Sequence, residues 1–408
     1  MVKEKKVKIM KKILICSHWM EIGGAERALL GLLYSIDYSK YQVDLYLCRH
    51  TGEFMSLIPK EVNLLPEDKK AASIAIPAKE ALKKGCWDIV IGRILGKIKT
   101  SQYLKTHKET QNCVAVEYSN KYTYKRVAPI NPEVTYDLLI SFLEPHYIAV
   151  NKAKSKKKVA WMHTDYSFVS MDTKEAYNIW NQYDKIAAIS KDCWIAFAKK
   201  FPQLENKLFL MNNILHPELI RQQATEFEVD KEMPKGDEIR ILSMGRYCYA
   251  KNFDNVPDIC RRIREKGFNI KWYLIGYGGD EALILDKIKE CQMEKYVIML
   301  GKKANPYPYI KSCDIYVQPS RYEGNSVTVH EAQMLGKPVV ITKYPTSASQ
   351  LEDGVDGVIV PVDNVGCAEG ITKLLSNPAY LEELKENCRL NDYSNCTEVE
   401  KLYRFMED

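Results

Sequence analysis

Two glutamates, Glu323 and Glu331, stand eight residues apart in the second half of the sequence. We expect Glu323 on a loop and Glu331 inside the following helix, among apolar residues such as Val327 and Val329. A carboxylate accepts hydrogen bonds on both oxygens, so the pair suits a ligand with vicinal hydroxyl groups. A glutamate in an apolar helix is costly to bury without a partner, which argues against a plain surface role for Glu331.

The start of the same helix offers backbone donors. The N–H groups of Asn325, Ser326 and Val327 precede the first helical hydrogen bonds, and such groups can point at an anion. The sequence therefore predicts an anionic ligand beside the two glutamates.

Two cations belong to one predicted loop, between Gly245 and Asp254, after the first strand of the second half. Arg246 offers a planar fork to phosphate oxygens and Lys251 a point charge, so together they could neutralise a diphosphate. The alternative is that both are ordinary loop cations.

Glycines follow two further strands. Gly276 and Gly278 would let the backbone approach a ligand, and Gly23 and Gly24 form the corresponding loop of the first half. The loop of the first half is neither a Walker motif nor a G-x-G-x-x-G motif, which argues against ATP hydrolysis and against NAD.

His163 is expected at a strand end, where it could reach a cleft between domains. His330, next to Glu331, is read as a packed or exposed histidine. The sequence has no Asp-x-Asp motif and no His, Cys and Asp cluster with zinc spacing, so we expect no metal and no cofactor.

Strand-like runs alternate with helical patterns along the whole chain, which is typical of parallel sheets built from βαβ units. Candidate strands in the first half are Lys12–Ser17, Val43–Cys48, Trp87–Ile91, Val114–Val116, Tyr136–Ser141, Val159–Met162, Ile186–Ile189 and Leu208–Met211. Those of the second half are Ile239–Ser243, Lys271–Ile275, Val297–Leu300, Asp314–Val317, Pro338–Ile341 and Gly357–Val360. The predicted fold class is α/β, with two Rossmann-like doubly wound parallel-sheet domains facing each other across a cleft.

A chain of 408 residues is long for one core and suits two domains. We place the N-terminal domain at 1–216, a polar interdomain linker at 217–237 and the C-terminal domain at 238–390. The last helix, within 391–408, could return to the N-terminal domain.

Charge is distributed unevenly. The first 210 residues carry 34 Lys and Arg against 22 Asp and Glu, whereas the remainder is acidic. Basic segments at 3–12, 121–126 and 152–158 suit an anionic inner leaflet or a lipid phosphate, or serve only solubility. No nucleic-acid-binding module accompanies them, so no nucleic-acid partner is expected.

Hydropathy and cysteine usage indicate an intracellular protein. No apolar run approaches the roughly 18 residues of a membrane span, and no signal peptide is recognised. The twelve cysteines have no C-x2-C pair, so we expect them to be reduced. The expected location is the cytoplasm, and the alternative is a peripheral location at the inner face of the plasma membrane.

The motifs together resemble glycosyltransferase family 4, retaining enzymes of the GT-B fold, from Lys12 to about Tyr403. The resemblance rests on Gly23-Gly24, Gly245-Arg246, Lys251-Asn252 and the Glu-x7-Glu spacing of Glu323 and Glu331. It implies an acceptor-binding N-terminal domain and a nucleotide-sugar-binding C-terminal domain. Arg246 and Lys251 would bind the diphosphate, Glu323 the donor sugar, Glu331 the ribose, and His163 the donor near the reacting carbon.

Two departures from the family pattern concern the part of the site that reads the sugar. Asn325-Ser326 replaces an aromatic-Gly pair, and 344–348 replaces a Gly-Gly segment; both are similar to a bacterial capsule and exopolysaccharide subgroup. The resemblance implies a hexosyltransferase that uses a UDP-linked sugar and a hydroxyl of a polysaccharide or lipid-linked oligosaccharide. Alternatives are a nucleotide-sugar 2-epimerase and a non-catalytic partner subunit of another glycosyltransferase.

Overall fold

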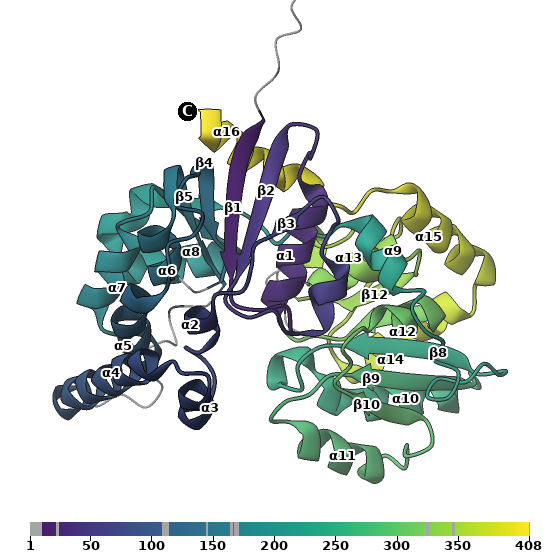
Figure 1. Ribbon diagram of the computed structural model, residues 1–408. Coiled ribbons are helices and arrows are strands. Elements are labelled where there is room, and N and C mark those ends of the chain that lie inside the picture. The colour runs from purple at the N-terminus through teal and green to yellow at the C-terminus, as the bar shows by residue number, and fades with distance from the viewer. Residues whose placement is uncertain are drawn as a thin grey trace, which may run out of the picture. The chain divides into compact units, whose positions relative to one another are not determined.

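The computed structural model describes residues 10–21, 24–107, 114–143, 146–163, 166, 171–323, 326–344 and 347–407. The chain divides into two compact α/β units, and Figure 1 labels most of their elements. The first unit runs up to Ile214 and includes the C-terminal segment from Cys396, and the second spans Leu215–Asn395.

The first unit contains a seven-stranded parallel sheet in the order β3-β2-β1-β4-β5-β6-β7. Leu14 and Ile15 in β1 are both fully buried although they point to opposite faces, because helices cover both sides. The strands are β1 Lys11–Ser17, β2 Tyr41–Leu47, β3 Asn63–Leu64, β4 Thr135–Ser141, β5 Lys154–Met162, β6 Lys185–Ala188 and β7 Leu208–Leu210. The helices are α1 Gly24–Ser35, α2 Lys69–Ala72, α3 Ala78–Lys83, α4 Trp87–Thr106, α5 Val114–Thr123, α6 His146–Lys152, α7 Thr173–Trp180, α8 Lys191–Lys200 and α16 Glu400–Glu407.

Two predicted strands of this unit are wrong. Residues 87–91 begin helix α4 and residues 114–116 begin helix α5. The β-branched runs favour a strand locally, but the two helices pack closely along their length, so tertiary contact overrides the local preference. The two-residue strand β3 was not predicted.

The second unit contains a six-stranded parallel sheet in the order β10-β9-β8-β11-β12-β13. All six predicted strands of this half are present, with small differences at their ends. The strands are β8 Ile239–Met244, β9 Ile270–Ile275, β10 Val297–Gly301, β11 Ile315–Gln318, β12 Val339–Thr342 and β13 Val358–Val360. The helices are α9 Pro217–Gln223, α10 Val256–Glu265, α11 Glu281–Glu290, α12 Tyr307–Ser312, α13 Val327–Met334, α14 Asn364–Leu375 and α15 Pro378–Leu390.

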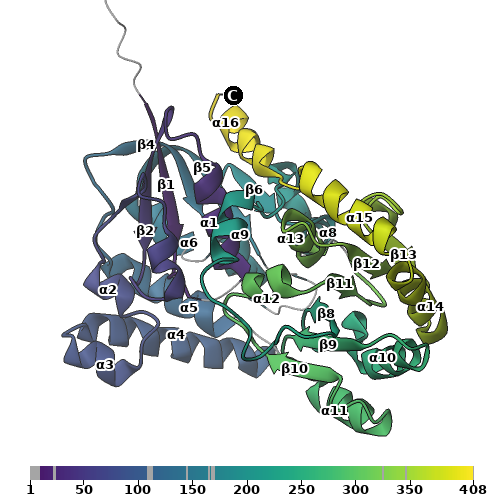
Figure 2. The same ribbon diagram turned by 90° about the vertical axis from the view of Figure 1, so that its right-hand side faces the viewer.

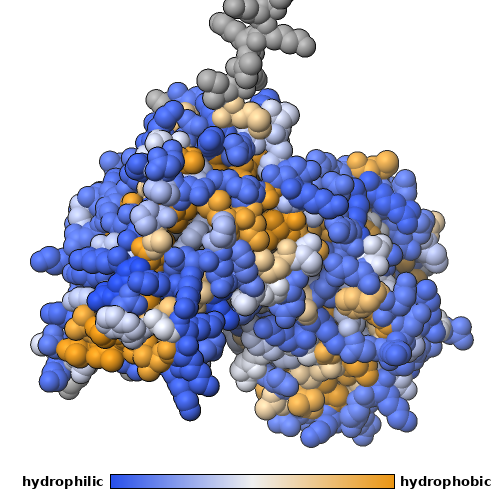
Figure 3. All heavy atoms as spheres, viewed as in Figure 1, coloured by the Kyte–Doolittle hydropathy of each residue, from blue (hydrophilic) through white to orange (hydrophobic). Residues whose placement is uncertain are grey.

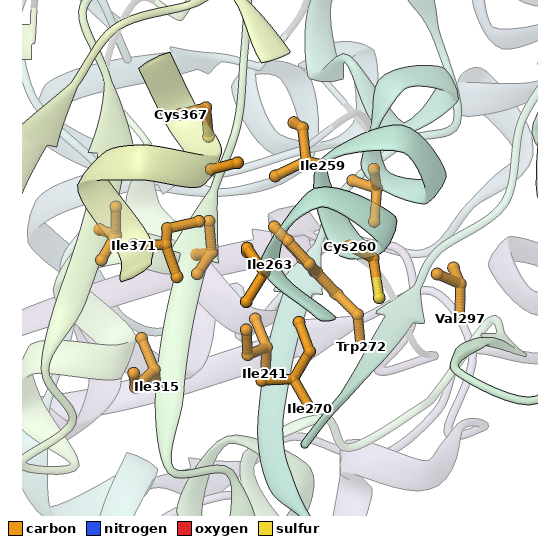
Figure 4. Close-up of a cluster of buried hydrophobic side chains, with 14 of the residues drawn as sticks. Ile241, Ile259, Cys260, Ile263, Ile270, Trp272, Val297, Ile315, Cys367 and Ile371 are labelled. Atoms are coloured by element: carbon orange, nitrogen blue, oxygen red, sulfur yellow. The ribbon is translucent and has the colours of Figure 1, made fainter. Parts of the chain in front are cut away.

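Successive residues of the second sheet belong to two different cores. Trp272 and Leu274 of β9 pack with α10 and α14 residues, as Figure 4 shows for Trp272 beside Ile263. Tyr273 and Ile275 pack on the opposite face with residues of α12 and α13. This alternation is what a parallel sheet covered on both faces requires.

The segment 217–237 is not a solvated connection. It begins with α9, and Ile220, Ala224, Val229 and Met233 are buried in the core of the second unit. The C-terminal helix α16, visible in Figure 2, packs within the first unit. The Tyr403 hydroxyl there accepts a hydrogen bond from the Asp37 N–H at 2.9 Å, and the Tyr403 ring stacks on Tyr41.

Candidate functional site

The carboxyl ends of β8 and β11 carry the predicted cation and carboxylate, and the structure joins them. Lys251 Nζ lies 2.5 Å from Oε1 of Glu323. The two side chains are only 19% and 10% exposed, so this ion pair is largely shielded from water. Partial burial strengthens the interaction and makes the loss of either partner costly.

Further donors converge on the same carboxylate. Ser320 Oγ donates to Glu323 Oε1 at 2.6 Å and Gln318 Nε2 at 3.3 Å. The Gln318 side-chain oxygen in turn accepts from the hydroxyl of Tyr316 at 2.8 Å. Glu323 is therefore held by a buried polar network that runs back into strand β11.

The loop after β8 is tied to the loop after β11. Asn252 is fully buried with a left-handed backbone (φ 61°), and its Nδ2 donates to the Pro319 carbonyl at 2.8 Å. Arg321 bonds both carboxylate oxygens of Asp254, at 2.8 and 2.7 Å. These contacts fix the positions of Lys251 and Glu323 relative to each other.

Arg246 lies in the same loop, and its side chain is exposed. The N–H of the preceding residue, Gly245, donates to the carbonyl of Ile275, the last residue of β9. This backbone hydrogen bond fixes the chain beside Arg246 at the carboxyl end of β9. An exposed guanidinium at the end of a parallel strand is available to an anionic ligand.

Glu331 is buried in α13, with 4% of its surface exposed. The Tyr307 hydroxyl from α12 donates to its Oε1 at 2.7 Å. This contact answers the expectation that a glutamate in an apolar helix requires a partner.

At the start of α13, one of the backbone N–H groups that we expected to face an anion is bonded within the protein instead. The Ser326 N–H donates to Gln350 Oε1 at 2.7 Å, and Gln350 Nε2 donates back to the Ser326 carbonyl. Val327, the first helical residue, is partly exposed. Asn325 lies outside the described residues.

His330 is packed rather than presented to a ligand. Its ring nitrogens contact Gln333 at 3.1 Å and Gln350 at 3.0 Å. Burial lowers the pKa of His330 below its ordinary value, which keeps the ring neutral near pH 7.

Gly276 and Gly278 follow β9, and the structure gives them a packing role. A Cβ on Gly276 would lie 1.9 Å from the Gly245 carbonyl oxygen, and one on Gly278 would lie 2.3 Å from that of Tyr247. The backbone of this loop therefore lies directly against the loop that carries Arg246. Only glycine at positions 276 and 278 permits so close an approach.

In the first unit, Gly24 is the first residue of α1, and no described atom lies within 4 Å of a Cβ built there. Gly23 lies outside the described residues. His163 follows β5 and contacts the ring of Phe142, with 4.7 Å between ring centroids.

Burial lowers the pKa of His163 to about 4, so the ring is neutral at physiological pH. Its Nε2 atom is buried and has no hydrogen-bond partner within the part of the chain that the structure describes. An unsatisfied buried nitrogen of this kind is uncommon and calls for an explanation.

The described ranges contain neither a metal-binding cluster nor a membrane-spanning helix. Three or more His, Cys, Asp or Glu side chains do not gather there in an arrangement that could hold a metal ion. None of the helices described is both long and apolar enough to cross a bilayer.

The sequence model of the family Glycosyl transferases group 1 matches residues 224–391, which contain every site residue of the second unit. Amylovoran biosynthesis glycosyltransferase AmsD of Erwinia amylovora is 27% identical over 148 residues, which are 36% of this chain and 40% of AmsD. A Campylobacter jejuni enzyme, N-acetylgalactosamine-N,N'-diacetylbacillosaminyl-diphospho-undecaprenol 4-alpha-N-acetylgalactosaminyltransferase, is 29% identical over 182 residues, 44% of this chain and 47% of the enzyme. The chain thus spans less than half the length of these two relatives.

The fold is that of two-domain glycosyltransferases of the GT-B type. The crystal structure of Anabaena HepE in complex with UDP and glucose superposes with a TM-score of 0.59 and covers 98% of this chain and 100% of HepE. The sequences are 14% identical, so the likeness concerns the fold alone. It extends over both units, whereas the family model matches only the second.

Several residues that build the site were not predicted from the sequence. Tyr307 and Gln350 lie in elements other than those carrying Glu331 and Ser326, and nothing in their local sequence marks them. Gln318 is different, because it ends strand β11, where functional residues of parallel sheets gather.

Proposed function

We propose that this chain is a retaining glycosyltransferase that moves a hexose from a UDP-linked sugar to a hydroxyl of a polysaccharide or lipid-linked oligosaccharide. The observation that carries the proposal is the Lys251 and Glu323 pair at the ends of β8 and β11, inside the segment that matches the group 1 family. Cation and carboxylate at one sheet edge suit a ligand that is part diphosphate and part sugar.

Lys251 has three N–H groups and can keep its bond to Glu323 while a second N–H meets a phosphate oxygen. Arg246, exposed in the same loop, would bind the same diphosphate from its other side. Charge develops on the diphosphate as the sugar leaves, and fixed cations stabilise that charge. Glu323 would accept hydrogen bonds from sugar hydroxyls and Glu331 from the ribose.

The reaction we propose breaks the bond between the anomeric carbon and the diphosphate oxygen on one face of the sugar. The acceptor oxygen bonds to the anomeric carbon on the same face, and its proton passes to the leaving phosphate. Configuration is retained, and the step needs no covalent enzyme intermediate, metal or cofactor. His163 would contribute to donor binding as a neutral ring.

The relatives support the choice of substrates. AmsD acts in amylovoran biosynthesis, the Campylobacter enzyme is named for a diphospho-undecaprenol acceptor, and HepE was solved with UDP and glucose. We extend these classes of donor and acceptor to this chain as a proposal, with action in the cytoplasm at the inner face of the plasma membrane.

The first test is a donor screen by thermal unfolding with UDP-, GDP- and ADP-sugars, because a ligand that binds only the native state raises its stability. We expect a UDP-sugar to give the largest shift. Arg246→Ala should then abolish that shift, while Arg221→Ala, which removes another exposed arginine of the second unit, should not.

Two results separate the alternatives. A non-catalytic subunit would bind no donor in the screen. A 2-epimerase would bind the donor and convert it to an isomer without any acceptor, which analysis of the sugar products detects. A shift of equal size with all three donors, or with both arginine variants, would contradict the proposed site.

A further inference from the structure

Helix α4 of the first unit carries large apolar side chains on its outer face. Trp87, Ile91, Ile94, Leu95 and Ile98 are 64%, 43%, 51%, 40% and 49% exposed. They recur at spacings of three or four residues and so form one stripe along the helix. Figure 3 shows hydrophobic surface over this helix, at the position that α4 has in Figure 1.

The opposite face of α4 packs on α5 and carries small residues. Gly92, Gly96 and Thr100 are buried there, again at a spacing of four. A Cβ on Gly92 would lie 2.8 Å from the Tyr122 carbonyl oxygen, and one on Gly96 would lie 2.8 Å from the Ser119 N–H nitrogen. The helices therefore touch backbone to backbone.

This arrangement inverts the usual amphipathic helix of a protein surrounded by water. Such a helix turns its large apolar residues to the core and its polar residues outward. Each glycine within a helix costs about 1 kcal/mol relative to alanine. Here two glycines hold the helix pair together while tryptophan, leucine and isoleucine face outward. Small residues between helices and large apolar residues around them are typical of helices in contact with lipid.

The charges on α4 are nearly all positive. Arg93, Lys97, Lys99 and Lys105 are its cations, and no acidic residue occurs from Ile89 to His107. The one acid of the helix, Asp88, is paired with Lys70 at 2.6 Å. Since successive residues of a helix turn by a third to a quarter of a circle, Lys97 and Lys99 fall on opposite sides of the apolar stripe.

A groove of about 440 Å³ lies beside the stripe. It is lined by Lys97, Thr100, Ser101, Leu104, Lys105 and Ala115. Two ammonium groups and the Ser101 hydroxyl at one groove are suited to an anionic phosphate group. The Thr100 hydroxyl instead donates to the Gly96 carbonyl at 2.9 Å.

We propose that the outer face of α4 docks on a lipid bilayer that contains anionic lipids. The helix would lie in the plane of the interface, with the apolar stripe at the acyl boundary, Trp87 at headgroup level and the lysines against lipid phosphates. None of the described helices is long and apolar enough to cross a bilayer. The contact we propose is with the bilayer surface.

The charge pattern favours this occupant over a second copy of the chain. A symmetric contact through α4 would place the lysines of one copy against those of the other, because both copies use the same patch. An anionic bilayer opposes them with negative charge along the whole helix.

The α4 face differs from the basic segments singled out in the sequence. In those segments Lys121 is paired with Glu175 at 2.5 Å, and Lys156 is paired with Asp137 at 2.7 Å. Their charge is partly neutralised within the protein, whereas the α4 stripe combines cations with exposed apolar side chains.

The test is flotation of the full chain with vesicles of phosphatidylcholine and phosphatidylglycerol in equal parts, compared with vesicles of phosphatidylcholine alone. We expect binding to the mixed vesicles. Replacing Ile94 and Ile98 by glutamine should weaken partitioning about tenfold or more, because each loses buried apolar surface. Ile195→Gln is the matched control, since Ile195 is equally apolar and 64% exposed on α8 of the same unit.

A second pair of variants tests the charge. Lys97→Gln should lower partitioning to the mixed vesicles by roughly fivefold, the factor for about 1 kcal/mol per cation near an anionic surface. Lys199→Gln on α8 should leave it unchanged. Tryptophan emission should shift to the blue on mixed vesicles, and Trp87→Phe should remove that shift.

Two results would overturn the proposal. The first is that the unaltered chain does not bind mixed vesicles at low salt, or that the α4 variants bind them as well as the α8 variants and the unaltered chain do. The other is a dimer that the Ile94 and Ile98 substitutions convert to monomer, which would assign the face to a second copy. Unchanged thermal unfolding of the variants confirms that the exposed substitutions leave the fold intact. Neither vesicle binding nor the oligomeric state depends on transferase activity.

Discussion

Lys251 and Glu323 are 72 residues apart in the sequence, yet the lysine Nζ lies 2.5 Å from the glutamate Oε1. Both residues follow parallel strands that are neighbours in the sheet, β8 and β11. The pair therefore depends on the sheet order, in which a strand from late in the domain lies beside its first strand. Its energetic role can be separated from its proposed role in transfer.

Lys251→Met should lower the free energy of unfolding by roughly 1–3 kcal/mol, because it leaves the Glu323 carboxylate shielded and without its cation. It should also lower turnover of the donor by about 100-fold or more. Urea unfolding and UDP release measure the two effects. Adding Glu323→Gln to Lys251→Met should recover stability but not turnover. A single variant with normal stability and normal turnover would refute both roles.

Sequence reasoning reached this pair from two separate loops, because each side chain follows a strand end where ligands of parallel sheets bind. It could not tell that the two would contact each other, since that depends on the neighbouring strands. For the same reason it missed Tyr307 and Gln350, whose partners lie in other elements.

The strands of the second unit were predicted well because each is a short, continuous apolar run covered on both faces. In the first unit the same kind of run misled at 87–91 and 114–116, which are helical. These two segments are helical because α4 and α5 pack closely together at Gly92 and Gly96. The local pattern of β-branched residues does not reveal this packing.

The Tyr307 hydroxyl is expected to hold the Glu331 carboxylate in place for the nucleotide. Tyr307→Phe removes its 2.7 Å hydrogen bond, so UDP should bind roughly 10- to 100-fold more weakly, as the loss of one hydrogen bond to a charged group predicts. Titration calorimetry with UDP measures the change. Tyr309→Phe is a close control, because Tyr309 lies on the same helix and its hydroxyl bonds to Glu232 instead. Equal effects of the two substitutions would exclude a specific role for Tyr307.

Gly276 keeps the loop after β9 in contact with the loop that carries Arg246. Gly276→Ala would place a Cβ 1.9 Å from the Gly245 carbonyl oxygen, so one backbone must shift. We expect the free energy of unfolding to fall by about 1–3 kcal/mol, as for overpacked sites, and UDP affinity to fall with it.

Gly279→Ala provides the comparison within the same loop. No described atom lies within 4 Å of a Cβ at Gly279, so the unfolding free energy should stay within about 0.5 kcal/mol of the original. If urea unfolding finds the two alanine variants equally stable, close approach is not the reason for the glycine at 276.

His163 should make the stability of the first unit depend on pH. Burial lowers its pKa to about 4 in the folded protein, against about 6.5 in the unfolded chain. Between these values the unfolded chain binds the proton and the folded one does not, so stability rises with pH across this window. The contribution is complete above pH about 6.5 and is lost as the pH falls toward 4, at up to about 1.4 kcal/mol per pH unit.

His163→Asn replaces the ring by an amide that stays neutral throughout this window. Its unfolding free energy, measured in urea from pH 7 to pH 4, should therefore fall less steeply than that of the unaltered chain. Because the comparison is between slopes, a uniform loss of stability from the buried substitution does not obscure it. Identical slopes for His163→Asn and the unaltered chain would mean that the ring is charged as easily in the folded protein as in the unfolded one, which its burial against Phe142 argues against.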